Sequence, residues 1–136
     1  NLTLLGTGNA TVTHCYNTCF VLHESGQYLL VDGGGGNGLL CQLEKAHLRW
    51  QDMRMVFVTH KHMDHLLGIL WLMRMMCQSW RRGTSSEAVI YGHEEVISLL
   101  RTMGMALLSS KDRAFLDDRL HLVTVNDGET RQLMGH

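Results

Sequence analysis

The chain has 136 residues, of which 45% are apolar and 18% are charged, a composition typical of one globular domain and not of a disordered segment. Its formal net charge is -1, which excludes a strongly basic protein that holds nucleic acid or an anionic membrane by overall charge. No segment resembles a signal peptide or a membrane span, so a cytoplasmic protein without a membrane partner is expected.

The first half of the chain predicts three strands and a helix. An apolar run at 2–5 stops at a glycine loop, and runs at 19–23 and 28–32 flank a turn containing Gly26, which predicts a hairpin. Four glycines follow at 33–36. Asn37 is then expected to cap a helix that continues to residue 47.

The second half predicts an alternation of strands and helices. A strand at 55–59 is apolar on both faces, so both faces are expected to be covered. Residues 66–80 predict a helix that is apolar nearly all round, and it is either buried between layers or a contact between subunits. The remaining elements are a strand at 88–91, a helix at 94–103, and a hairpin of strands 120–125 and 131–134. Together they predict an α/β fold, a mixed sheet with helices on its faces.

Two other features have alternative interpretations. The glycines at 33–36 form either a backbone nest for an anion or a tight bend from strand to helix, and the bend is favoured because the Lys-Ser/Thr of a phosphate-binding loop is absent. The four cysteines include no C-x-x-C pair, so they are expected to be small buried or half-buried side chains and not a disulfide or a zinc knot. They are Cys15, Cys19, Cys41 and Cys77.

The segment most informative about chemistry is 58–65, which places three imidazoles and a carboxylate where a buried strand ends and a helix begins. Side chains alternate in an extended segment, so His60 and His62 point to the same side and can reach one metal ion. Asp64 and His65 follow the turn and suit a second ion. Nitrogen and carboxylate ligands without thiolates favour zinc, with manganese or iron as alternatives. The competing interpretation is a surface cluster in which Asp64 caps the helix.

This motif, His60-x-His62-x-Asp64-His65, resembles the metal motif of the metallo-β-lactamase superfamily. The segment 4–10 resembles the first strand and loop of its ribonuclease Z-like branch, and 30–34 resembles the strand-end aspartate that precedes the first helix. The resemblance implies an αββα sandwich built from two similar halves. Residues 1–136 would form a single domain that corresponds to the N-terminal half, truncated at its C-terminus.

The resemblance also implies how metal is held. His60 and His62 would bind one zinc ion and Asp64 and His65 the other, giving two ions per complete site. Later ligands of the family lie beyond this chain, except that His136 is either the next histidine ligand or a terminal histidine. With two ligands per ion the fragment alone is expected to bind metal weakly and to be inactive.

Roles within the site follow from general chemistry. Two metal ions that share a water present hydroxide at neutral pH, and Asp64, the candidate catalytic residue, can both ligate and accept the proton of that water. Asp32, at a neighbouring strand end, can accept the free N–H of a ligating histidine from behind the metal, or it is a turn residue before the glycines.

The function predicted from these observations is that of a metal-dependent hydrolase, a phosphodiesterase of the ribonuclease Z type, with nucleic acid as a candidate substrate. The neutral charge balance keeps a thioester or other small-ester hydrolase as an alternative. A hypothesis of another class is an inactive half-domain that self-associates through the apolar helix 66–80. A homo-oligomer, such as a dimer, is the expected assembly.

Overall fold

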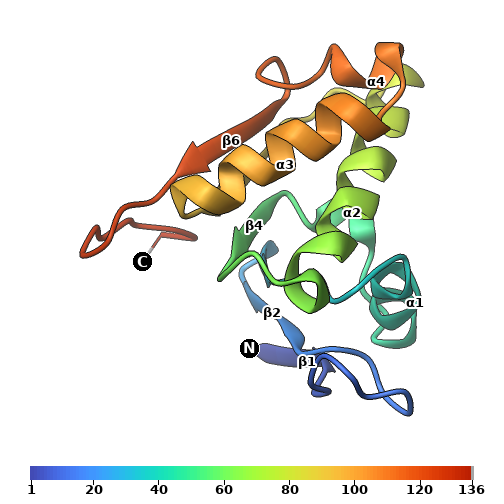
Figure 1. Ribbon diagram of the computed structural model, residues 1–136, viewed down its shortest axis with the longest axis vertical. Coiled ribbons are helices and arrows are strands. Elements are labelled where there is room, and N and C mark those ends of the chain that lie inside the picture. Colours follow the sequence, from blue (N-terminus) through green and yellow to red (C-terminus); the bar gives the residue numbers. More distant parts are fainter. Residues whose placement is uncertain (136) are drawn as a thin grey trace.

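The computed structural model describes residues 1–135 and shows one six-stranded sheet with helices packed on it (Figure 1). The strands are β1 (Leu2–Gly6), β2 (Cys19–Glu24), β3 (Gln27–Val31), β4 (Met55–Val58), β5 (Ala88–Gly92) and β6 (Leu120–Thr124). The helices are α1 (Gly38–Lys45), α2 (Met63–Arg81), α3 (Glu94–Leu107) and the short α4 (Ser110–Arg113), with a 3₁₀ turn η1 (Trp50–Asp52).

The strands lie in chain order across the sheet, β1-β2-β3-β4-β5-β6. The first two pairs are antiparallel, and β3 to β6 pair in parallel. Parallel neighbours are joined through helical segments, and the buried side chains of α1, α2 and α3 share one core cluster with those of the strands, so the three helices cover the same face of the sheet. The predicted mixed α/β architecture and the N-terminal hairpin are confirmed.

The core lies between this sheet face and the helices. Val56 and Val58 of β4 and Ile90 of β5 are fully buried against Leu72 and Leu100 of the helices. These strand residues alternate with side chains on the opposite face, as the period of two requires. Burial on the helical side alone therefore holds the sheet and the helices together.

The opposite sheet face carries apolar side chains that the described residues do not cover. Leu2 and Leu4 of β1 are 59% and 61% exposed, and Met55 and Phe57 of β4 are only partly buried. The prediction that β4 is covered on both faces is therefore wrong for residues 1–135. Its apolar sequence indicates a face prepared for burial, but the helices reach only one side.

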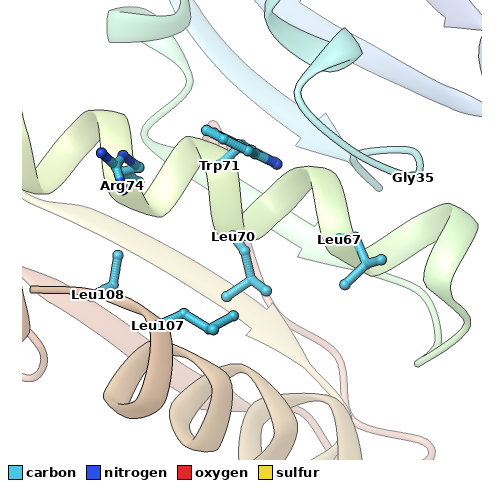
Figure 2. A pocket seen from close by; sticks show the side chains of 7 residues that line it. All are labelled: Gly35, Leu67, Leu70, Trp71, Arg74, Leu107 and Leu108. Atoms are coloured by element: carbon cyan, nitrogen blue, oxygen red, sulfur yellow. The ribbon is translucent and has the colours of Figure 1, made fainter.

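Helix α2 is longer than the predicted 66–80, because its first turn begins at Met63 inside the histidine motif. Its inner side is buried, and its outer side faces an apolar groove of about 260 Å³ shared with the end of α3 (Figure 2). The side chains that line this outer groove are Leu67, Leu70, Trp71, Arg74, Leu107 and Leu108, beside Gly35. In the described residues, no helix is long and apolar enough to cross a membrane.

The prediction of a C-terminal hairpin is wrong. A turn does form at 126–129, with the Glu129 N–H donating to the Asn126 carbonyl at 3.0 Å, but residues 131–134 form no strand and β6 pairs with β5 in parallel. Asn37 stands at the start of α1 without a side-chain capping bond. The cysteines are free, Cys19 and Cys77 buried but Cys15 and Cys41 exposed, so their predicted burial is right for two of them.

Candidate metal centre

The residues of the histidine motif lie at the carboxyl ends of β3 and β4. Asp32 directly follows β3, and Thr59 and His60 follow β4. The two strands are parallel neighbours, with Val31 opposite Phe57, so their ends meet at one edge of the sheet. The carboxyl edge of parallel strands is where open α/β sheets place their sites.

Helix α2 carries the second part of the motif. His62 is the residue before its first turn, and Asp64 and His65 lie within that turn. Asp64 is therefore not the N-cap, and α2 has no side-chain capping bond. The alternative in which Asp64 caps the helix is wrong, because the helix starts earlier than the sequence indicated.

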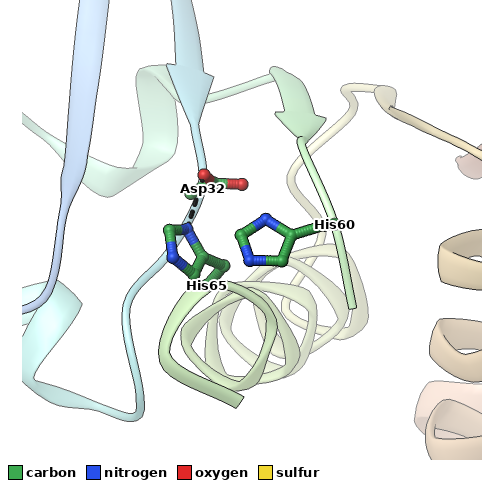
Figure 3. Close-up of side chains that lie close together, drawn as sticks. All are labelled: Asp32, His60 and His65. Carbon is green, nitrogen blue, oxygen red and sulfur yellow. Dashed lines mark hydrogen bonds and ion pairs between the residues drawn. The ribbon is translucent and has the colours of Figure 1, made fainter. Parts of the chain in front are cut away.

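Asp32 is the buried centre of the hydrogen bonds at this edge, with an exposed fraction of 4%. The Thr59 N–H donates to Asp32 Oδ1 at 2.8 Å, and the Thr59 hydroxyl donates to Oδ2 at 2.7 Å. His65 Nδ1 donates to the same Oδ2 at 2.8 Å (Figure 3). This is the contact that the role of Asp32 behind a ligating histidine requires. Its backbone has φ 59°, an uncommon conformation for a residue with a side chain, which the surrounding bonds must hold in place.

The three imidazoles of the motif pack against one another. The ring centroids of His60 and His65 are 4.1 Å apart and those of His60 and His62 are 4.7 Å apart. His65 Nε2 lies 3.3 Å from Asp64 Oδ2. The side chains thus form a continuous cluster, with the exposed His62 at its outer rim.

One pair of candidate donor atoms belongs to Asp64 and His65. His65 Nδ1 donates to Asp32, and its other ring nitrogen, Nε2, lies 3.3 Å from Asp64 Oδ2. A cation shared between these two atoms, either a proton on Nε2 or a metal ion, would hold them together. Zinc bonds of about 2.0–2.2 Å at a tetrahedral angle separate two ligand atoms by about 3.4 Å. The observed distance matches that requirement.

A second grouping of donors involves Asp32. Asp32, His60 and His65 each offer a ligand atom, and these atoms lie within 4.8 Å of one another. The two oxygens of Asp32 already accept the three hydrogen bonds described above. An ionised carboxylate has about four acceptor positions, so little of Asp32 is left for a metal ion. We therefore assign Asp32 to orientation of the rings and not to ligation.

The glycine bend at 33–36 supports this cluster and is not a nest for an anion. The Gly33 N–H donates to the carbonyl of His65 at 2.8 Å, and the Gly68 N–H donates to the carbonyl of Gly34 at 2.9 Å. The amides of Gly35 and Gly36 donate to side chains of the preceding loop. These amides already have partners within the protein, so the bend interpretation holds and the nest is wrong.

The loop before β2 clamps the glycine bend. The Tyr16 hydroxyl lies 2.7 Å from the carbonyl oxygen of Gly33 and 2.9 Å from that of Gly36, and its single hydrogen can be donated to either. Burial raises the pKa of Tyr16 to about 12, so the hydroxyl stays a donor at neutral pH. Asn17 Oδ1 accepts from the Gly35 amide at 3.0 Å. Neither residue was singled out from the sequence, because nothing in the local pattern of this loop connects it to the motif.

The lysine within the motif has an acidic partner. Lys61 lies between the first two histidines and forms an ion pair with Glu95 in the first turn of α3. Its hydrogen bond holds the pKa of the Glu95 carboxyl below its usual range.

The structure thus brings His60, His62, Asp64 and His65 into one cluster with Asp32 behind it. Thr59 is a residue that the sequence reasoning missed. A β-branched hydroxyl side chain at the end of an apolar strand, directly before the motif, was the available signal. His136, the remaining candidate ligand, lies outside the described residues.

Comparison with known protein families gives one match to the whole chain. The model of a family described as anti-Pycsar protein Apyc1 matches residues 1–136. Among curated proteins, ribonuclease Z of Borrelia duttonii (strain Ly) is 34% identical over 80 residues, which are 58% of this chain and 24% of that protein. The aligned part therefore spans about a quarter of that relative's length.

Solved structures show the same fold. Human tRNase Z, short form, superimposes with a TM-score of 0.67 and 27% identity, over 90% of this chain and 42% of that one. The metallo-β-lactamase fold protein YhfI from Bacillus subtilis superimposes with a TM-score of 0.69 and 17% identity, over 98% of this chain and 49% of its own. The predicted resemblance to metallo-β-lactamase-fold hydrolases of the ribonuclease Z-like branch is confirmed, and the chain covers about half of that fold.

Proposed function

The chain belongs to the family of the anti-Pycsar protein Apyc1, and we propose that it carries the metal-binding part of a metal-dependent phosphodiesterase of the ribonuclease Z type. The observation that carries the proposal is the approach of His65 Nε2 to Asp64 Oδ2 at 3.3 Å, with the rings of His60 and His62 alongside. An imidazole nitrogen and a carboxylate oxygen at this distance can share a metal ion.

The proposed ligands follow from this cluster. His60 and His62 hold one zinc ion, and Asp64 and His65 hold the second, with manganese or iron as alternatives. Bound at this place, the metal ions would lower the pKa of a water and stabilise negative charge on the substrate oxygen. Asp64 is the proposed catalytic residue, because its carboxylate can accept the proton that the attacking water gives up.

The substrate class is proposed from the relatives and from charge. Relatives named ribonuclease Z and tRNase Z favour a phosphodiester, with nucleic acid as a candidate. The net charge of -1 and the pairing of Lys61 with Glu95 leave the metal ions as the main positive charge at the site. A thioester or other small ester remains the competing substrate class, since one fold serves several hydrolytic reactions.

The test has two parts. Zinc binding is measured on this chain by calorimetry, and His62→Ala and Asp64→Ala are each expected to weaken it at least tenfold, because each removes a ligand. Hydrolysis of bis(p-nitrophenyl) phosphate and of a thioester is then compared in a protein that contains this chain together with the later ligands of the family. The same two variants should lower turnover there by about a hundredfold or more.

Matched controls are available on the surface. His121→Ala and Asp118→Ala remove an imidazole and a carboxylate at the start of β6, the sheet edge opposite the motif, and both should bind zinc and turn over normally. Full turnover after Asp64→Ala would remove that residue from the reaction. Faster thioester than diester cleavage would favour the competing substrate class.

For assembly we propose a homo-oligomer in which a second copy covers the groove beside α2 (Figure 2). The groove is lined mainly by apolar side chains, and Trp71 within it is 41% exposed. Large apolar patches on a soluble surface are typical of contacts between proteins. The uncovered sheet face around Leu4 is the competing contact surface.

Light scattering on the chain distinguishes the two surfaces. Trp71→Glu should yield a monomer because it buries a charge in the contact, whereas Gln78→Glu, elsewhere on the same helix, should not change the mass. A monomeric wild-type chain contradicts the proposal. An oligomer that survives Trp71→Glu but is lost in Leu4→Glu moves the contact to the sheet face.

A further inference from the structure

The Thr59 hydroxyl lies between the buried carboxylate and one of the candidate ligands. It donates its hydrogen to Asp32 Oδ2 at 2.7 Å and lies 2.9 Å from His60 Nδ1. A hydroxyl has a single hydrogen, and the carboxylate takes it. The contact with His60 is therefore a hydrogen bond only if Nδ1 of the ring carries the proton and donates to the threonine oxygen.

This direction of donation determines the tautomer of His60. A neutral imidazole with its proton on Nδ1 has its lone pair on Nε2, the atom then available to a metal ion. The same argument holds at His65, whose Nδ1 donates directly to Asp32 Oδ2 at 2.8 Å. Both rings lie on the same side of Asp32 (Figure 3).

We propose that Thr59 is a positioning residue. Its hydroxyl links the Asp32 carboxylate to His60 through two hydrogen bonds, a relay that holds the His60 ring with its proton on Nδ1. One buried carboxylate thereby orients a ligand of each of the two metal ions, His65 directly and His60 through Thr59. The proposal rests on the proposed function only in taking the two Nε2 atoms as metal ligands. The hydrogen bonds that define the tautomers exist without metal.

Thr59 also holds the Asp32 carboxylate in place. Its backbone N–H donates to Asp32 Oδ1 at 2.8 Å while its hydroxyl donates to Oδ2. Both oxygens of Asp32 are therefore held by one residue at the end of β4. Thr59→Val keeps the β-branched shape and the backbone bond and removes only the hydroxyl, whereas Thr59→Ser keeps the hydroxyl. The two variants form a matched pair.

The direct test is the tautomer of His60 in the metal-free chain. Long-range ¹H–¹⁵N spectra at about pH 8, where histidine is mostly neutral, distinguish a proton on Nδ1 from one on Nε2. His60→Gln assigns the signal. Wild type and Thr59→Ser should show Nδ1–H at His60, and Thr59→Val should shift the proton toward Nε2. His65 should keep Nδ1–H in all three.

Zinc affinity, measured by competition with a chelator, is the second readout. Thr59→Val should bind zinc about 10- to 100-fold more weakly than Thr59→Ser, the usual effect of losing a partner behind a metal ligand. A wild-type His60 with its proton on Nε2 would overturn the relay, and so would a Thr59→Val chain that keeps both the Nδ1 proton and the full affinity. If the tautomers are as expected but no diester is cleaved, the relay stands and the proposed function fails.

Discussion

Gly68, in the second turn of α2, is the position where the structure makes the sharpest demand on a single residue. A Cβ atom placed there would lie 1.8 Å from the carbonyl oxygen of Gly33 and 2.6 Å from its carbonyl carbon. These are backbone atoms of the bend that follows Asp32, so they cannot rotate away. We predict that Gly68→Ala both destabilises the chain and disturbs the cluster of candidate metal ligands.

The magnitude follows from the displacement. Reaching ordinary contact at 3.4 Å requires the bend and the helix to separate by about 1.6 Å, which breaks the two hydrogen bonds that join Gly33 to His65 and Gly68 to Gly34. Each is worth about 1 kcal/mol, and forcing packed elements apart costs about 1–3 kcal/mol more. Alanine recovers about 1 kcal/mol through helix propensity. The net loss is about 2–4 kcal/mol, or about 10 °C in Tm.

Gly104→Ala is the matched control. Gly104 also lies inside a long helix, so the propensity gain is the same, but a Cβ there meets only side-chain ends, the nearest being Met73 Cε at 3.3 Å. We expect this variant to be as stable as wild type or more stable by up to about 1 kcal/mol. Urea unfolding followed by circular dichroism measures both variants, and zinc affinity should fall only in Gly68→Ala. If the two variants are equally stable, the close approach of α2 to the glycine bend does not exist.

Two further predictions concern buried protons. Burial raises the pKa of the Cys19 and Cys77 thiols to about 12. Iodoacetamide at neutral pH should therefore modify Cys15 and Cys41 in the folded chain, and Cys19 and Cys77 only after unfolding. Mass spectrometry that finds all four cysteines modified together would contradict the burial of these two thiols. These two thiols and Tyr16 keep their protons when folded to about pH 12, whereas in the unfolded chain they lose them from about pH 9–10. The folded state therefore binds more protons in that interval, and the urea midpoint should fall as pH rises through it. A midpoint that is unchanged between pH 8 and pH 10.5 would refute this.

The candidate ligands could be predicted from the sequence because they are local. Six consecutive residues, 60–65, contain all four, and the alternation of an extended segment already places two of them together. Asp32 and Thr59 are different, because their contact depends on the register that sets Val31 of β3 opposite Phe57 of β4. That pairing joins residues 27 positions apart. The sequence therefore indicated the candidate ligands better than the side chains that orient them.

The C-terminal hairpin was also predicted wrongly, because strand pairing is not fixed by the local pattern. The turn at 126–129 forms as its residues predict, with φ of +76° at Gly128. Pairing with β5 occupies one edge of β6 and leaves the other open, because β6 is the last strand of the sheet. The residues after the turn do not use that edge, and Arg131 lies with its guanidinium 5.7 Å from the centroid of the Tyr91 ring. A local turn signal predicts that the chain reverses, but not whether the residues after the turn join the sheet.

The cluster of candidate metal ligands is held in place by a chain of contacts that starts at residues distant in the sequence. The hydroxyl of Tyr16 holds the carbonyls of the glycine bend, the bend holds the first turns of α2 through the carbonyl of His65 and the amide of Gly68, and that turn carries Asp64 and His65. The bend can approach α2 so closely only because both partners are glycine, at Gly33 and Gly68. A larger side chain at either position would push α2 away from the bend and so move His65 away from Asp32, without itself contacting a candidate ligand. Gly33 and Gly68 are therefore required for the geometry of the motif, although neither can bind a metal ion through a side chain.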